Sequence, residues 1–362
     1  MGAGVLVTCL LPAIAAARPA PDIRVDAGLL RDRILASASR PYQGVADSRG
    51  GVQLPNVPEL DEVNALFAGA TIRVWYASAG AWRVALIHQT GERDIYRTGQ
   101  LTSVWDFERH LLTEITGELP IRLPWAADVA PPELARRLLR GAAPSDPVVA
   151  IAARRVAGVA AAGLRLTPSD PATTIDHVDI WADPRTGLPV QVEVGGRGTG
   201  TSVLTTRFLE LRQQAPAADV VTPPARGSAG FTVTSAPDVA ARINTVVPGP
   251  LPSSLAGTPR SAFTGLVGVG GYGSGLAMFV AVPLPGRLGS RIVGAARDAG
   301  ALPVEVAGGE AYEVRAAALT TLVVRTAGDR QSRRAYLLAG FVDGERLRRA
   351  AAELVAFAGP TR

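Results

Sequence analysis

Apolar and polar residues alternate along several short stretches in the first two thirds of the chain. Alternation of this kind marks strands of an antiparallel sheet with one covered and one solvated face. Turn residues such as Gly80 and Gly99 separate the stretches at intervals of roughly ten residues, which is typical of a meander rather than of βαβ units. The predicted strands cover residues 71–76, 82–87, 94–97, 102–107, 152–159, 164–167, 175–182, 188–194 and 203–211.

Two segments in this region follow a helical period instead. Residues 26–38 place Leu30 and Ile34 on one face, and residues 131–140 begin with proline and stop before Gly141. An Ala/Pro/Gly-rich stretch at 213–237 then predicts the end of a domain and a linker at 226–237.

The remaining residues, 238–362, predict a second and smaller domain. Helical periods at 238–246, 288–299 and 344–357 alternate with strand patterns at 265–282, 303–306, 311–325 and 334–342. That order is typical of a compact α+β domain. The whole chain is therefore assigned to the α+β class.

The N-terminus carries an apolar run, VLVTCLLPAIAAA, at residues 5–17. Its length fits a signal-peptide core and is short of a membrane span. Small residues at its end offer a cleavage site, although no basic residue precedes the run, which leaves an uncleaved anchor open. We expect residues 1–20 to be a signal peptide or N-terminal anchor, and the protein to be exported to the cell envelope or secreted.

Composition removes several classes of chemistry. All 37 basic residues are arginine, so no Schiff-base or P-loop lysine is present, and one cysteine and three histidines offer little for a metal site. The arginines are scattered, and the net charge of +5 is mild, so no nucleic-acid surface is predicted. We expect no catalytic residues, no metal and no cofactor.

One glycine-rich motif could be a dinucleotide-binding loop or a hairpin turn. The sequence at 268–273 matches the dinucleotide pattern G-x-G-x-x-G, but an apolar strand pattern follows it where that motif requires a helix. We interpret it as a hairpin turn.

His177 has no second histidine nearby and is interpreted as a half-exposed strand residue rather than a metal ligand.

The order of several short motifs resembles one superfamily. The motifs are GATIRVWY at 69–76, WRV at 82–84, GERD at 91–94, VWD at 104–106, GLRLTP at 163–168, VDIWADPRTGLP at 178–189 and VVTPP at 220–224. Together they resemble the lipoprotein-carrier superfamily of LolA and LolB, and most closely the N-terminal domain of RseB (MucB) and exported actinobacterial relatives. The resemblance covers about residues 25–225. The arginine-only, alanine-rich composition is also typical of actinobacteria.

The resemblance implies an open antiparallel half-barrel whose concave side is capped by helices and encloses an apolar cavity. It implies a lipid or lipidated peptide as ligand, and no catalytic residues. Some carriers hold their lid with an arginine, for which Arg73 is the candidate here.

Alternation itself selects the residues that should face the covered side. They are Ile72, Val74, Tyr76, Val84, Leu86, Val178, Ile180, Val190, Val192 and Val194. The same strands carry Arg73, Arg83, Asp179 and Glu193 on the other face, which we expect to be solvated. The covered side is either a ligand cavity or an ordinary filled core, and the pattern leaves both open.

Two functions remain. The first is a regulator in envelope signalling or sigma-factor control, with an anti-sigma factor or membrane transporter as partner. The second is a lipid or lipoprotein carrier that acts purely in transfer. The extra C-terminal domain favours the regulator, because a simple carrier needs no additional partner-binding surface.

Overall fold

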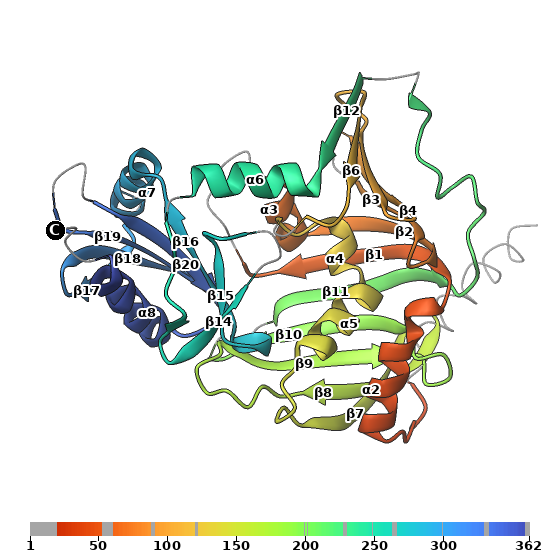
Figure 1. Ribbon diagram of the computed structural model, residues 1–362. Coiled ribbons are helices and arrows are strands. Elements are labelled where there is room, and N and C mark those ends of the chain that lie inside the picture. Colours follow the sequence, from red (N-terminus) through yellow and green to blue (C-terminus); the bar gives the residue numbers. More distant parts are fainter. Residues whose placement is uncertain are drawn as a thin grey trace, which may run out of the picture.

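The strands form two separate sheets, one in each part of the chain (Figure 1). The computed structural model describes residues 20–52, 61–87, 91–119, 122–198, 200, 202–226, 230–247, 249–262, 266–298, 300–328 and 333–358. The predicted signal or anchor segment therefore lies outside the described residues, apart from Ala20.

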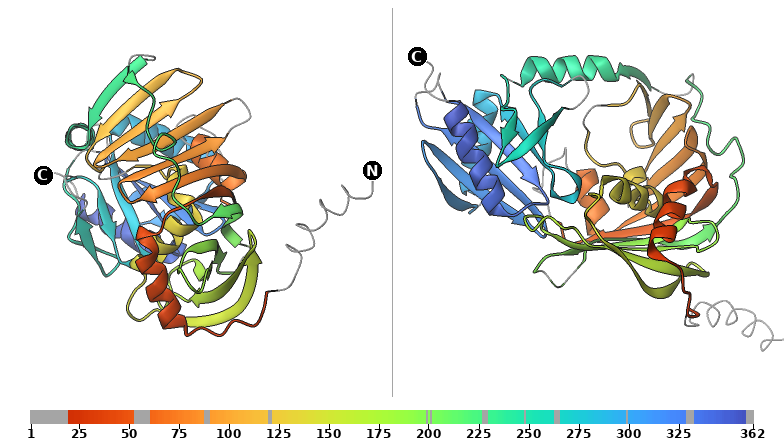
Figure 2. Two further views of the ribbon diagram at one scale, coloured as in Figure 1. Left: turned by 90° about the vertical axis from the view of Figure 1, so that its right-hand side faces the viewer. Right: turned by 60° about the horizontal axis from the view of Figure 1, so that its bottom comes forward.

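The first sheet has twelve strands in the order β12-β6-β5-β4-β3-β2-β1-β11-β10-β9-β8-β7. All neighbours are antiparallel except β12 and β6, which run parallel. The sheet is curled, but its described strands do not close into a barrel (Figure 2). Its strands are β1 (Tyr42–Gly50), β2 (Ala70–Ser78), β3 (Ala81–Ile87), β4 (Glu92–Thr98), β5 (Leu101–Asp106), β6 (Leu111–Thr116), β7 (Val148–Val156), β8 (Val159–Leu166), β9 (Ile175–Ala182), β10 (Pro189–Gly196), β11 (Ser202–Arg212) and β12 (Gly230–Ser235).

Three helices lie over one face of this sheet and are called here the lid helices (Figure 1). They are α2 (Ala27–Ala36), α4 (Ala126–Val129) and α5 (Pro131–Gly141). Helix α2 begins at Asp26, whose carboxylate accepts a hydrogen bond of 2.8 Å from the Leu29 amide, and it continues into the 3₁₀ turn η1 (Ser37–Ser39). Contacts join α2 to β7 and β8, and α5 to β10 and β11. Helix α3 (Asp61–Ala68) packs on β1.

The second sheet has eight antiparallel strands, in the order β13-β14-β15-β16-β20-β19-β18-β17. Helices α7 and α8 pack on it, and α6 follows directly after β12. The glycine motif forms β15 and its turn into β16, which confirms the hairpin interpretation. The elements are α6 (Ala236–Val246), β13 (Ser254–Leu255), β14 (Thr258–Ala262), β15 (Gly270–Tyr272), η4 (Gly275–Ala277), β16 (Phe279–Leu284), α7 (Gly286–Asp298), β17 (Leu302–Val306), β18 (Gly309–Ala316), β19 (Leu319–Thr326), β20 (Ala335–Gly340) and α8 (Gly344–Phe357).

Some predicted boundaries are wrong for identifiable reasons. The predicted strand 152–159 is interrupted, because Ala157 and Gly158 take positive φ angles of 46° and 81° and turn the chain from β7 into β8. Strand β1 was not predicted, since a bulge between Val45 and Ala46 breaks its alternation. The predicted linker 226–237 is not irregular throughout, because residues 230–235 form β12 on the edge of the first sheet.

The C-terminal unit packs directly on the first sheet. Ala318 is buried in the core of that sheet, and Leu319 and Phe341 pack against this core. Thr173, before β9, forms an isolated β-bridge with Val342, and its hydroxyl oxygen lies 2.8 and 2.9 Å from the carbonyl oxygens of Leu276 and Phe341. The division of the chain into two independently folding domains stays a prediction.

The expectation of a solvated second face is wrong for most of the residues that carried it. Arg73 is exposed, but Asp179 is 4% exposed and binds Arg165 through two hydrogen bonds of 2.7 Å. Glu193 accepts a hydrogen bond of 2.5 Å from Arg154. Arg165 and Asp179 are opposite each other on β8 and β9, so ion pairs between strands cover these outer residues, which alternation alone does not reveal.

Candidate functional site: a cavity under the lid helices

A cavity of about 630 Å³ lies between the lid helices and the covered face of the first sheet. Its floor comes from β1 to β6, and its roof comes from the end of α2, from η1, and from α4 and α5. The lining residues are Leu35, Ala38, Tyr42, Val74, Tyr76, Ala79, Trp82, Val84, Arg97, Thr102, Ile115, Gly117, Glu118, Leu119, Arg122, Trp125, Ala127, Asp128, Ala130, Glu133, Arg136, Arg137 and Arg140.

The floor of the cavity is apolar. Val74 and Val84 are opposite each other on β2 and β3 and are almost fully buried. The rings of Tyr42 and Tyr76 stack with centroids 5.0 Å apart. The Tyr76 hydroxyl donates a 2.6 Å hydrogen bond to the Ala38 carbonyl, which ties the floor to the end of the lid, and burial raises the pKa of Tyr76.

The roof carries a buried arginine. Arg136, on α5, is 3% exposed and donates hydrogen bonds to Ser37 Oγ at 3.4 Å and to Glu133 at 3.2 Å. Ser37 in turn donates to the Ile34 carbonyl at 2.6 Å, so Arg136 links α5 to the end of α2. Because a buried guanidinium is stable only with partners, this link fixes the side chain at the cavity wall.

A second charged group closes one end of the cavity. Asp128 accepts hydrogen bonds from both guanidinium nitrogens of Arg122 and, at 2.6 Å, from Arg137. Burial alone would raise the pKa of Asp128, but the hydrogen bonds and charge of Arg122 outweigh it and lower that pKa. The Arg122 guanidinium also lies 3.9 Å from the centre of the Trp125 ring.

All ten residues predicted for the covered side are buried in one hydrophobic core, but they do not share one environment. Val74, Tyr76 and Val84 line the cavity. The remaining seven, Ile72, Leu86, Val178, Ile180, Val190, Val192 and Val194, do not line it. Their role as a ligand-binding set therefore stays a prediction, and its structural basis is confined to the three cavity residues.

The arginine suggested for holding the lid is in the wrong place. Arg73 is on the outer face of β2, whereas Arg136, on the lid helix itself, makes the connection. The sequence contained a signal for it, since Arg136 lies three residues after Glu133 on the predicted helix and pairs with it. Arg137 lies four residues after Glu133 and carries a similar helical signal, whereas Arg97 and Arg122 follow no such pattern.

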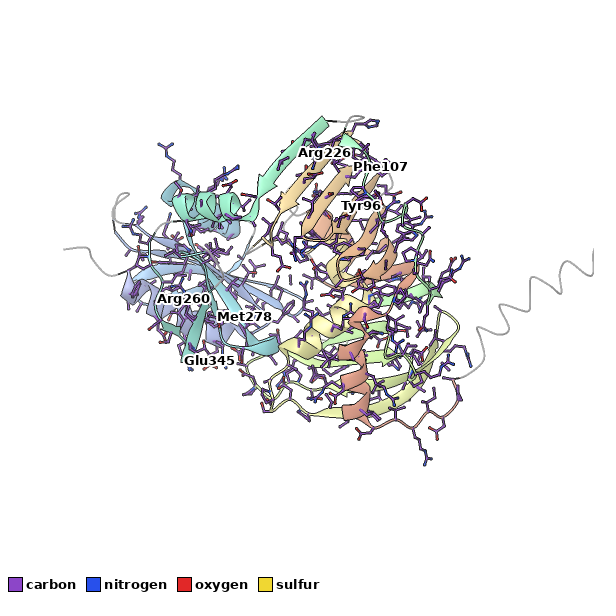
Figure 3. All side chains as sticks on the ribbon, turned by 45° about the vertical axis from the view of Figure 1, so that its right-hand side comes forward. Tyr96, Phe107, Arg226, Arg260, Met278 and Glu345 are labelled. Carbon is purple, nitrogen blue, oxygen red and sulfur yellow. The ribbon has the colours of Figure 1, made fainter. Side chains whose placement is uncertain are left out.

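A buried polar cluster lies on the outer face of the same strands. Arg83 binds Asp94 at 2.7 Å and Glu92 at 3.0 Å, and the Tyr96 hydroxyl donates to Asp94 at 3.0 Å. Figure 3 shows Tyr96 with Arg226 at this end of the molecule, where Arg226 binds Glu114 at 2.6 Å. Burial raises the pKa of Asp94 to about 6, although the Arg83 charge opposes that rise.

A larger groove, of about 1020 Å³, lies on the outer face near the β7–β8 turn. Its charged residues pair with one another: Asp47 binds Arg49 at 2.7 Å and Arg207 at 3.1 Å, and Glu193 binds Arg154. Asp47 and Glu193 in this groove are therefore each matched by an arginine.

His177, considered above as a metal ligand, is a partly buried strand residue. Its Nδ1 lies 2.8 Å from Asp176 and its Nε2 lies 3.8 Å from Asp179. Among the described residues, no group of three or more His, Cys, Asp or Glu side chains could hold a metal ion. None of the helices in the described part of the chain has the length and apolar content needed to cross a membrane.

The geometry suits a molecule with an apolar part and a polar end. An apolar floor favours a hydrocarbon chain, since each buried CH₂ contributes about 0.8 kcal/mol. The arginines and hydroxyls at the cavity wall can hold hydrogen-bond acceptors. Most small-molecule sites combine such features.

Comparison with solved structures places the fold. A MucB structure in complex with the periplasmic part of MucA matches with a TM-score of 0.50 and 16% identity, over 90% of this chain and 97% of that chain. The Pseudomonas aeruginosa MucA/MucB complex matches with a TM-score of 0.50 and 17% identity, over the same shares. A LolA superfamily protein of Nitrosomonas europaea matches at 0.28 and 13%, over 55% and 99%.

No protein-family model matches the sequence, and no curated protein matches it. The chain therefore has a MucB-like fold, which confirms the resemblance to the RseB (MucB) fold found in the sequence. The similarity to MucB extends over both sheets, because it covers 90% of the chain.

Proposed function

We propose that this protein is an exported, non-catalytic envelope protein that binds a lipid or lipidated ligand in the cavity under its lid helices. The observation that carries the proposal is the apolar floor of Val74, Tyr76 and Val84 beneath a lid that hydrogen bonds fasten at Ser37 and Ala38. The LolA/RseB-like fold supports it as analogy.

The lid is suited to opening without unfolding the sheet. Over the cavity, the hydrogen bond from Tyr76 to Ala38 ties it to the floor and contributes about 1 kcal/mol. Helix α5 also packs on β10 and β11, so its movement would be a shift across the sheet rather than a detachment from it. A chain entering beneath α4 would exchange water contact for the apolar floor.

We further propose that the protein acts in envelope signalling or sigma-factor regulation, with an anti-sigma factor as the expected partner. Two neighbours of the same fold were solved with MucA bound. The C-terminal unit also contacts the lid, since η4 packs against α5 where Gly275 approaches the Gly141 carbonyl. Ligand-driven movement of α5 would thereby reach the C-terminal surface. The alternative is a carrier that acts purely in transfer, and a membrane transporter is the other partner class.

A test of ligand binding uses the delipidated full chain and an apolar fluorophore. We expect uptake by the folded protein, and co-purified lipid in native mass spectrometry. Val84→Trp should reduce uptake, because the indole would fill the cavity. Val149→Trp is the matched control, since Val149 is 51% exposed on the edge strand β7. Absence of uptake by the folded chain would exclude lipid binding and leave the signalling proposal on its own.

A second test separates the regulator from the carrier. Purified chain is mixed with the extracytoplasmic part of any anti-sigma factor encoded beside its gene, with and without bound lipid. Lipid-dependent binding would support the regulator, whereas neighbouring lipoprotein-processing genes and no such binding would support the carrier. Fractionation with N-terminal mass analysis tests export, and full-length protein in the cytosol would contradict it.

A further inference from the structure

We infer that the ligand of the cavity carries an anionic head group, held by arginines of the roof and of β4. This inference rests on the proposed function and specifies the class of lipid. The lining residues include five arginines and three carboxylates, which leaves an excess of two positive charges beside an apolar floor. The arginines are Arg97, Arg122, Arg136, Arg137 and Arg140, and the carboxylates are Asp128, Glu118 and Glu133.

Two of the carboxylates are each shared between arginines. Asp128 lies between Arg122 and Arg137. Glu133 lies between Arg136, at 3.2 Å, and Arg140, at 3.5 Å. Arg137 also lies 3.9 Å from Glu133, so two carboxylates serve four guanidiniums, and this cluster keeps an excess of two positive charges.

Arg97 has the most distant carboxylate partner of the five. Its side chain is 13% exposed, and its closest hydrogen bonds go to neutral oxygens, those of Thr102 at 2.8 Å and Gln100 at 3.3 Å. Its carboxylate neighbour, Glu118, is 3.7 Å away and 86% exposed, so solvent weakens that pair. A partly buried guanidinium whose carboxylate neighbour is mostly in solvent favours an anionic ligand.

The same cavity sets the direction of the ligand. Ile95, which precedes Arg97 by two residues on the inner face of β4, packs with Val104 and Ile115, and Ile115 lines the apolar floor beside Val84. A hydrocarbon chain along the floor thus ends near guanidiniums at the wall. A neutral head would leave their excess charge unmatched, whereas a carboxylate or phosphate would neutralise it.

The test compares four single-chain probes with one palmitoyl chain: palmitate, lysophosphatidate, lysophosphatidylcholine and monopalmitoylglycerol. Binding to the delipidated full chain is measured by fluorophore displacement below the micellar range. We expect palmitate and lysophosphatidate to bind at least about tenfold more tightly than the other two at low salt, with a smaller preference in 0.5 M salt. Preference for one acidic probe over the other identifies the carboxylate or the phosphate as the better head.

Variants then test the residues. Arg97→Gln and Arg140→Gln should each weaken binding of the acidic probes about fivefold and leave monopalmitoylglycerol unchanged, and Glu118→Gln should strengthen acidic binding. Arg49→Gln, on the outer face, removes the same charge and should change nothing. Equal binding of all four probes would overturn the anionic head and leave lipid binding standing. Absence of binding by every probe would instead contradict the proposed function.

Discussion

The two halves of the first sheet share the same alternating pattern, but the inward residues fill a core in one half and line a cavity in the other. In strands β8 to β11, called here the filled half, the inward residues are covered by α2 and α5 and are completely packed. In strands β2 to β6, called the cavity half, inward residues such as Val74 and Val84 border a cavity of about 630 Å³. Burial on a sheet face therefore does not distinguish a core from a binding site. The placement of the covering helices does.

The largest expected difference between the halves comes from overpacking. Ile180→Trp in the filled half should reduce the free energy of unfolding by about 3 kcal/mol, because interiors at native density have no room for an indole. Val84→Trp in the cavity half should cost less than about 1 kcal/mol, since the ring can enter the cavity. Urea unfolding of the two variants measures both. Equal losses would mean that the cavity half is packed as tightly as the filled half.

Truncating one buried valine in each half to alanine tests the same difference in packing with matched residues. Val192→Ala should cost about 2 kcal/mol, from lost transfer free energy and from the new void. Val84→Ala should cost about 1 kcal/mol, because its side chain already borders a cavity. Thermal unfolding monitored by circular dichroism is the measurement. A larger loss for Val84 would reverse the assignment of the two halves.

The pH dependence of the free energy of unfolding tests the outer face of the cavity half. Burial raises the pKa of Asp94 to about 6, so the folded state holds this proton more tightly than the unfolded chain does. Its contribution to stability is present at pH 4 and is lost as the pH rises through 6, by about 1–2 kcal/mol. Comparing urea unfolding of the wild type and Asp94→Asn between pH 4 and 7 isolates it. Parallel curves for the two proteins would contradict the raised pKa.

The smallest effect is expected at Arg73, on the exposed face of β2. Arg73→Ala should change the free energy of unfolding by no more than about 0.5 kcal/mol, as exposed substitutions usually do. It should also leave fluorophore uptake unchanged. Arg136→Ala, which removes the link to Ser37, is the contrasting variant and should alter uptake. A defect in Arg73→Ala alone would restore Arg73 as the lid residue.

The secondary structure was predictable where one physical rule acted alone. Strand β2 alternates cleanly because one of its faces is solvated, and the turn at 183–187 follows from Pro184 and from Gly187, whose φ is 72°. Strand β10 is buried on both faces. Its alternation therefore predicted the strand correctly, but the expectation that Glu193 faces solvent was wrong. Strand β12 was missed because its pairing with β6 joins residues more than a hundred positions apart.

The sequence by itself determined the α+β class, the meander, the two lid helices and the set of inward apolar residues. Each of these depends on local propensity or on a two-residue or 3.6-residue period, which a linear pattern records. Only the tertiary structure decided which inward residues line a cavity and which arginines stand beside it. Those outcomes depend on where a helix lies across a curled sheet, and that position is set by packing between segments distant in sequence.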